Sequence, residues 1–384
     1  MMKTKYLLLP LLASSSLLSH MALANNHWPD LPIGVKNGVS AQIGSKVYVG
    51  LGSAEKSFYV LDTQAPQNGW TLLAEFIGPE RSGATATVVG ENIFVFGGSG
   101  KASDDASSPI IFDTVYRFDT QTNRWHQVKT QTPVGLLGAS SYSPDGKKVL
   151  FFGGYSKPLF DRYLADITRT DKKAKPEQWQ KIVDDYMGME PLAYQWNRDV
   201  LSFNPSNDKW DVVTRSPYLP NCGSAAVIDG PRITLISGEI KPGLRTAEVK
   251  TFTYGELQPW QSTYALPAAK GQAQQEGIAG AYSGVVSNTL LVAGGANFHG
   301  AKAQFESGQM FAHNGLSKAY NSEIYAKQKG VWQQVGQLPE GLAYGASFSV
   351  KGGVLMVGGE RADRTASTKV YLVGLNNNQI DIVD

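Results

Sequence analysis

The chain has 384 residues and a formal net charge of +2, and two of its lysines lie in the first five residues. Without those two lysines the net charge is about zero, which argues against a nucleic acid partner because phosphate binding needs a clear basic excess. Cys222 is the only cysteine, so an intramolecular disulfide is excluded. A domain this large has enough core to fold without one, and we interpret Cys222 as a small buried hydrophobic residue.

The first 24 residues have the pattern of a secretory signal peptide. Lys3 and Lys5 precede an apolar run through Leu18, and the small residues of Ala22-Leu23-Ala24 form a cleavage site. The apolar run is too short and interrupted to span a bilayer as a helix. We therefore expect cleavage after Ala24 and export, and because no other stretch is apolar enough to cross a membrane, we expect a soluble protein without membrane association.

A glycine doublet that closes a short β-rich run recurs along the chain. The clear copies end at Gly97-Gly98, Gly153-Gly154, Gly294-Gly295 and Gly358-Gly359, and degenerate copies lie at Gly50-Leu51-Gly52 and Ser237-Gly238. Each doublet is followed by a gap, an aromatic strand and, in most units, a Trp. Six such units predict an all-β fold, a six-bladed β-propeller that forms a single domain over residues 25–384.

We expect four antiparallel strands in each unit, beginning with an inner strand of small residues. A step of thirteen residues leads from Trp70 to Gly83, and the same step leads from Trp332 to Gly345, so we assign these glycines to the starts of inner strands. The C-terminal strand Gln379–Val383 is expected to complete the sixth blade. The segment at Trp28 also resembles an outer strand, but we favour a lead-in role for it.

The surplus length of the units falls between their second and third strands. These connections cover about 99–112, 155–198, 239–247, 296–321 and 360–367. In an up-and-down blade they emerge on one face, where binding and catalysis usually reside. The longest, the insertion around 155–198, is predicted to contain a helix over Lys175–Tyr186. The sequence leaves open whether it is a lid or a contact in a homodimer.

The sharpest local feature runs from Ser237 to Thr246. Pro242-Gly243 fits the central positions of a type II turn, which would bring Glu239 and Arg245 close together on the long-loop face. A carboxylate can transfer protons there, and a guanidinium can bind an anion or stabilise negative charge. An ordinary loop ion pair is the commoner explanation of such residue types.

Further candidates map to the same face, and we expect substrate contacts from some of them. They are Arg81, Tyr344, Arg361 and His313, with Glu360 and His299 nearby. Several arginines in one funnel would suit a carboxylated small molecule. The mature histidines lack the spacing of metal ligands, so we expect no metal site.

With these units in view, the chain resembles kelch-repeat propellers, and more narrowly the exported bacterial N-acetylneuraminate epimerases (sialic acid mutarotases). The specific matches are Val47 to Ala54, Leu61 to Ala65, Gly238 to Thr246, and Ala312-His313 with Gly315-Leu316. The resemblance implies a periplasmic isomerase that interconverts the α- and β-anomers of N-acetylneuraminate without a cofactor. It also implies that Glu239 is the proton acceptor and that Arg245 acts beside it.

Two other functions remain open from the sequence. A non-catalytic propeller that binds sialic acid or another glycan would share the arginine-lined funnel but would not need a carboxylate at Glu239. A kelch module that binds protein would use a broad apolar surface instead of a polar funnel.

Overall fold

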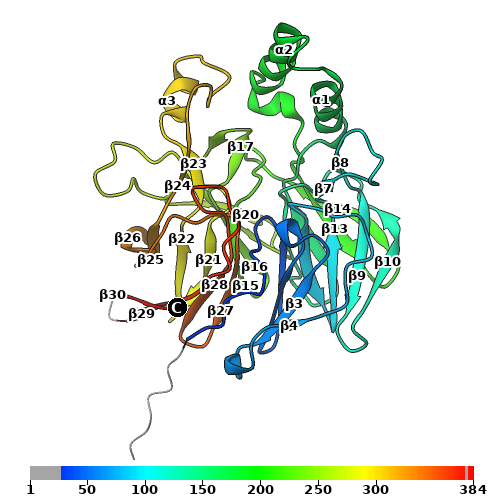
Figure 1. Ribbon diagram of the computed structural model, residues 1–384. Helices are drawn as coiled ribbons and strands as arrows, with labels where there is room; N and C mark the ends of the chain where they lie inside the picture. Colours follow the sequence, from blue (N-terminus) through cyan, green and yellow to red (C-terminus); the bar gives the residue numbers. More distant parts are fainter. Residues whose placement is uncertain (1–26, 377–378) are drawn as a thin grey trace, which may run out of the picture.

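The computed structural model of the chain describes residues 27–376 and 379–384, so the predicted signal peptide lies outside the described residues. Six four-stranded antiparallel sheets surround a central axis (Figure 1). The predicted six-bladed β-propeller is confirmed. No helix in the described part of the chain is long and apolar enough to cross a membrane.

Each blade is one continuous stretch of chain whose four strands pair in sequence order. The first three blades contain β1 (Val39–Ile43), β2 (Lys46–Gly50), β3 (Phe58–Asp62) and β4 (Thr71–Leu72); β5 (Thr85–Val89), β6 (Asn92–Phe96), β9 (Thr114–Asp119) and β10 (Arg124–Gln131); and β11 (Ser140–Tyr142), β12 (Val149–Phe152), β13 (Asp199–Asn204) and β14 (Lys209–Arg215). The last three contain β15 (Ala225–Asp229), β16 (Arg232–Ile236), β19 (Val249–Thr253) and β20 (Trp260–Thr263); β21 (Tyr282–Val286), β22 (Thr289–Ala293), β25 (Glu323–Gln328) and β26 (Val331–Gln337); and β27 (Ala346–Val350), β28 (Gly353–Val357), β29 (Val370–Asn376) and β30 (Gln379–Val383).

The ring closes through packing between its first and last blades. Strand β30 pairs with β29, which confirms that the C-terminal strand completes the sixth blade. The lead-in residues Trp28, Leu31 and Val35 are buried in the hydrophobic cluster between the sixth and first blades. Five further clusters fill the other interfaces, so the core of this protein lies between blades.

A closed ring of backbone hydrogen bonds surrounds the central axis. Its members lie just before the inner strand of each blade. Each N–H of the ring donates to the carbonyl of the equivalent residue in the preceding blade, over Asn37, Gly83, Gly138, Gly223, Gly280 and Tyr344. All six residues have a positive φ, between 52° and 70°, which glycine adopts without strain. The sixth ring position is therefore Tyr344, and Gly345, which was predicted to open the inner strand, lies directly before β27.

The glycine doublets turn the second strand of each blade away from the sheet. Both positions of each doublet have a positive φ, and the degenerate copies keep this conformation with Leu51 at 58° and Ser237 at 60°. The residue after each doublet then hydrogen-bonds to the residue before the ring, as Glu239 does with Cys222 and Glu360 does with Ala343. We call these six residues the rim residues: Ser53, Ser99, Tyr155, Glu239, Ala296 and Glu360.

The connections between second and third strands carry the remaining structure, as predicted. They contain the helices α1 (Lys157–Arg169), α2 (Pro176–Met187) and α3 (Ala301–Glu306), the 3-10 turns η1 (Gly52–Ala54) and η3 (Pro191–Tyr194), and the strand pairs β7 (Ser99–Gly100) with β8 (Ile110–Ile111), β17 (Glu239–Lys241) with β18 (Leu244–Arg245), and β23 (Ala296–Phe298) with β24 (Lys318–Tyr320). A third 3-10 turn, η2 (Pro66–Asn68), lies between β3 and β4. The helices and β17 lie at one end of the propeller (Figure 1, top). Helix α2 confirms the helix predicted over Lys175–Tyr186.

Candidate functional site

The hairpin of β17 and β18 places the two principal candidates opposite each other. Pro242 and Gly243 form the turn. Gly243 has a φ of 81°, which glycine adopts without strain, and the proline ring fixes the negative φ of the preceding Pro242. Glu239 and Arg245 are Cα partners across the hairpin, and the Oε1 atom of Glu239 lies 2.8 Å from Nη2 of Arg245. The predicted proximity of these two side chains is confirmed.

Two further donors orient the Glu239 carboxylate. The hydroxyl of Tyr155 donates to Oε2 at 3.0 Å, and the backbone N–H of Gly243 donates to Oε1 at 3.3 Å. The Tyr155 ring stacks on Trp196 with a centroid distance of 4.2 Å, and burial raises its pKa well above the usual value, so the phenol keeps its proton. The Glu239 side chain is still 18% exposed, so a ligand can reach a carboxylate whose orientation is fixed.

Arg245 is buried behind Glu239. Its side chain is 4% exposed, and its guanidinium lies 4.9 Å from the centroid of the Phe298 ring. Burial by itself lowers the pKa of this guanidinium, but Glu239 and Tyr344 outweigh that effect and hold the pKa above its usual value. Nε and Nη1 have no hydrogen-bond partner among the described residues. The cation is therefore permanent, and its one charged partner is the Glu239 carboxylate.

His313 lies against the turn of the same hairpin, as the sequence analysis expected of a site residue. A Cβ atom on Gly243 would lie 1.7 Å from Nδ1 of His313, so only glycine leaves room for the imidazole. Burial lowers the pKa of His313, and Arg245 lowers it further. The imidazole is consequently neutral at pH 7, and its Nδ1 atom has no hydrogen-bond partner in the described part of the chain.

Tyr344 also belongs to the site. It has a φ of 61°, a conformation that costs a tyrosine on the order of 1 kcal/mol and that often marks a functional residue. Its ring covers Gly280, where an added Cβ would approach it to 2.2 Å. The phenol interacts with Arg245, and the ring centroid lies 4.3 Å from Nζ of Lys318. Tyr344 thus contacts cations from two different blades.

Lys241 fastens the hairpin to the two longest insertions. Its side chain is fully buried, and its ammonium donates to the carbonyl of Met189 at 2.6 Å and to that of Met310. Burial lowers its pKa to about 8. Because Met189 follows α2 and Met310 follows α3, one side chain ties both insertions to the strand that carries Glu239.

The structure does not bring Arg81 to this site, which corrects the expectation of a substrate contact. The side chain is 2% exposed and its guanidinium is enclosed by the rings of Phe76, Phe112 and Tyr116. Nη1 donates to the carbonyl of Gly97 at 3.0 Å, and burial lowers the pKa to about 10. The physical reason is register: of the five equivalent positions two residues before the ring, four are the buried apolar Val35, Leu136, Ile278 and Leu342, and the fifth is the half-buried Asn221.

Arg361 points away from the site as well. Its Nε donates to Glu340 at 3.1 Å, beside the hydroxyl of Tyr371. Arg361 begins the tight turn that follows Glu360, in which the N–H of Arg364 donates to the Arg361 carbonyl. The expected role of Arg361 as a substrate contact is therefore not supported. His299 is exposed and lines a polar pocket of about 160 Å³ that also contains Tyr320.

Tyr155 was not predicted from the sequence, and Glu360 was placed on this face without a role. Both are rim residues that directly follow a glycine doublet, and so does Glu239. The position after the doublet is therefore the signal that would have found them. Among the described residues, no group of three or more His, Cys, Asp or Glu side chains is arranged to hold a metal ion.

The chain is similar to known proteins over nearly its whole length. The family described as N-acetylneuraminate epimerase matches residues 28–382. The chain is 98% identical over 384 residues to the N-acetylneuraminate epimerase of Vibrio vulnificus (strain YJ016), with all of both chains covered. It is 59% identical over 373 residues to that of Vibrio cholerae, with 97% of each chain covered. The solved structure of YjhT superposes with a TM-score of 0.87 at 32% identity, covering 93% of this chain and 99% of that one.

Proposed function

Because this chain belongs to the N-acetylneuraminate epimerase family, we propose that it interconverts the α- and β-anomers of N-acetylneuraminate. The observation that carries the proposal is the Glu239–Arg245 ion pair at the long-loop end of the propeller. It combines a reachable carboxylate with a permanent cation, which is what a proton transfer at an acidic sugar requires.

The proposed reaction begins with the ring form of the sugar. Glu239 removes the proton from the anomeric hydroxyl, the bond between the anomeric carbon and the ring oxygen breaks, and an acid protonates the departing ring oxygen. The resulting open-chain ketone rotates and closes again on its other face, with the protons returned. These steps transfer only protons, so the proposed isomerisation uses neither a cofactor nor a metal.

The neighbours of Glu239 have supporting roles in this proposal. Arg245 and the Tyr155 phenol hold the two carboxylate oxygens, at 2.8 Å and 3.0 Å, and so fix the direction from which Glu239 accepts the proton. Arg245 also stabilises negative charge that develops on the substrate oxygen. Fixed donors of this kind need no reorganisation during the reaction, which is the main source of their catalytic effect.

An NMR time course that starts from the pure α-anomer tests the proposal. The protein should accelerate the appearance of the β-anomer well above the spontaneous rate. The Glu239→Gln variant should lose the acceleration but remain folded, because the amide oxygen of glutamine still accepts a hydrogen bond from Arg245. Full activity of Glu239→Gln would refute the role of this carboxylate.

The same experiment separates catalysis from binding alone. A propeller that binds sialic acid without catalysis would shift the NMR signals of the sugar but leave the exchange rate at its spontaneous value. In that case wild-type protein and Glu239→Gln would give identical time courses. Treatment with a chelator such as EDTA should leave the rate unchanged if the mechanism uses only protein groups.

We also propose that the protein acts in the periplasm after cleavage at Ala24. This rests on the leader pattern of residues 1–24, which lies outside the described residues. Amino-terminal sequencing of protein from the periplasmic fraction should begin at Asn25. The insertion around 155–198 also remains a candidate homodimer contact, which sedimentation at several concentrations would test.

A further inference from the structure

The two acidic rim residues, Glu239 and Glu360, occupy equivalent positions in the fourth and sixth blades. Glu239 exchanges backbone hydrogen bonds with Cys222, and Glu360 does so with Ala343. Both carboxylates are therefore presented at the same end of the propeller. The side chains around them differ, since Glu239 contacts one arginine and Glu360 contacts two lysines.

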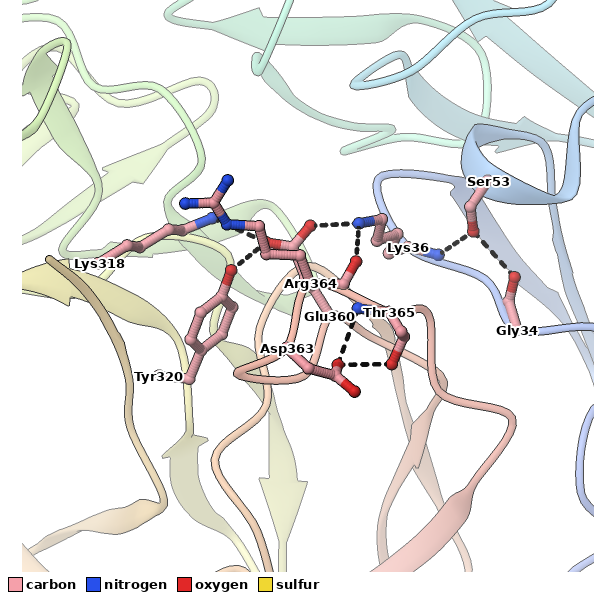
Figure 2. A network of polar contacts seen from close by, with 9 residues as sticks. All are labelled: Gly34, Lys36, Ser53, Lys318, Tyr320, Glu360, Asp363, Arg364 and Thr365. Carbon is pink, nitrogen blue, oxygen red and sulfur yellow. Dashed lines mark hydrogen bonds and ion pairs between the residues drawn. The ribbon is translucent and has the colours of Figure 1, made fainter.

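The Glu360 carboxylate is saturated with donors (Figure 2). Lys36 donates to Oε2 at 2.7 Å, Lys318 donates to Oε1 at 2.9 Å, and the hydroxyl of Tyr320 donates to Oε1 as well. Burial by itself raises the pKa of Glu360, but these hydrogen bonds outweigh it and lower the pKa to about 2. Glu360 cannot act as a proton acceptor near neutral pH, so another explanation of the cluster is needed.

The charges of the cluster do not cancel. Two ammonium groups share one carboxylate, which leaves an excess of one positive charge. The Lys36 and Lys318 side chains are 23% and 25% exposed, whereas Glu360 is 9% exposed. Lys318 makes one hydrogen bond through its ammonium among the described residues, so donors remain for a ligand. The cluster therefore presents cations to solvent and hides the anion that holds them.

Tyr344 connects this cluster with the Glu239–Arg245 pair. Nζ of Lys318 lies 4.3 Å from the centroid of the Tyr344 ring, and the phenol of the same residue interacts with Arg245. Lys318 of the Glu360 cluster and Arg245 of the Glu239 pair thus both contact the side chain of Tyr344.

Arg245 is a poor candidate for the carboxylate of such a ligand. Its side chain is 4% exposed, Nη2 is engaged by Glu239, and the Nε and Nη1 atoms are buried. Arg81 and Arg361 do not reach the site. The exposed cations of the Glu360 network are Lys36, Lys318 and Arg364 (Figure 2), and among the described residues only the two lysines form ion pairs with Glu360.

We propose that Lys36 and Lys318, held in place by Glu360, form the subsite that binds the substrate carboxylate. This rests on the proposed function and deepens it. In N-acetylneuraminate the carboxylate and the exchanging hydroxyl are attached to the same anomeric carbon. A carboxylate held by the lysines on one side and a base at Glu239 on the other would fix that carbon between them. Glu360 is a positioning residue in this arrangement, because it acts through the lysines.

Kinetics on a charged and an uncharged substrate test the subsite. The charged substrate is N-acetylneuraminate, and the uncharged one is its methyl ester, which keeps the ring and the anomeric hydroxyl. In Lys318→Met and in Lys36→Met, kcat/KM for the acid should fall about 10- to 100-fold, mainly through KM, because each lysine supplies a charge-assisted hydrogen bond. For the ester it should change by no more than about twofold. Lys318→Arg, which keeps the charge, should retain most of the preference for the acid.

A control lysine separates this effect from a general loss of charge. Lys369 forms a single ion pair at 2.8 Å with Asp30, away from the rim, and Lys369→Met should leave both rates unchanged. If Lys36→Met and Lys318→Met both kept the wild-type preference for the acid, or lost rate equally on acid and ester, the subsite would be wrong. Should one of these two variants fail to fold, the other carries the test.

The subsite and the proposed function can fail separately. If wild-type protein accelerates neither substrate, the proposed function is wrong, and calorimetric titration with the acid and the ester then tests the subsite alone. Tighter binding of the acid that disappears in Lys318→Met would support the subsite, and equal binding of acid and ester would overturn it.

Discussion

Glu239 and Glu360 have the same backbone position in two blades, yet their surroundings give them opposite chemistry. Glu239 is 18% exposed and accepts from one arginine, one phenol and one backbone N–H. Glu360 is 9% exposed and accepts from two lysines and one phenol. The repeat fixes where a rim carboxylate lies, and the long connections of neighbouring blades decide what it does. Variants that change the side chains around Glu239 and Glu360 test this difference between the two carboxylates.

The largest effect should follow removal of the cation beside Glu239. Arg245→Met leaves the carboxylate without its buried partner, so we expect kcat/KM to fall about 10²- to 10³-fold. Arg169, which pairs with Asp166 in an exposed part of α1, is the control, and Arg169→Met should have wild-type activity. Equal rates for Arg245→Met and wild type would show that the two rim sites do not differ in the way described.

The second prediction concerns the acid stability that Glu360 provides. Its pKa is about 2 in the folded state and 4.5 in the unfolded chain, so the unfolded chain binds more protons between these values. The stabilisation is therefore fully present above pH 4.5, where it is about 3 kcal/mol, and it is lost as pH falls towards 2. Urea unfolding from pH 7 to pH 2.5 should show this loss in wild type and a flatter profile in Glu360→Gln.

A pair of glycine variants tests the position of Tyr344 between the two sites. Gly280 and Gly223 have φ values of 66° and 63°, so alanine should cost each about 1 kcal/mol of stability. Only Gly280→Ala drives a methyl group into the Tyr344 ring, at 2.2 Å, since the nearest atom at Gly223 is 3.6 Å away. We expect about a tenfold loss of kcat/KM in Gly280→Ala and little loss in Gly223→Ala. Similar losses of kcat/KM in both variants would show that the position of Tyr344 does not affect activity.

The smallest effect should come from the two phenols. Tyr155→Phe removes the donor to Oε2 of Glu239 and should lower kcat by a few-fold to tenfold. Tyr320→Phe removes the donor to Glu360, whose two lysines remain, so kcat should be nearly unchanged. Steady-state kinetics measures kcat for both variants. A larger loss of kcat in Tyr320→Phe than in Tyr155→Phe would contradict the roles assigned to Glu239 and Glu360.

Much of the fold could be predicted because its signals are local. The glycine doublets need residues that adopt a positive φ, and the tight turns and long connections follow directly from the spacing of the strands. The Glu239–Arg245 pair was also predictable, because a turn at Pro242-Gly243 brings residues six positions apart together. The prediction for Arg81 was wrong because side chains from later in the blade, Phe112 and Tyr116, help to bury its guanidinium.

By itself the sequence determined the number of blades, the end at which the site lies and the hairpin that carries Glu239 and Arg245. Only the tertiary structure decided which cations reach the rim. Lys36 and Lys318 lie 324 and 42 positions from Glu360 in the chain, so no local pattern connects them. The closed ring brings Lys36, ahead of the first blade, and Lys318 of the fifth blade to Glu360 of the sixth. Aromatic rings enclose Arg81, and Glu340 holds Arg361. Closure and register are properties of the whole ring, which is why short motifs do not encode them.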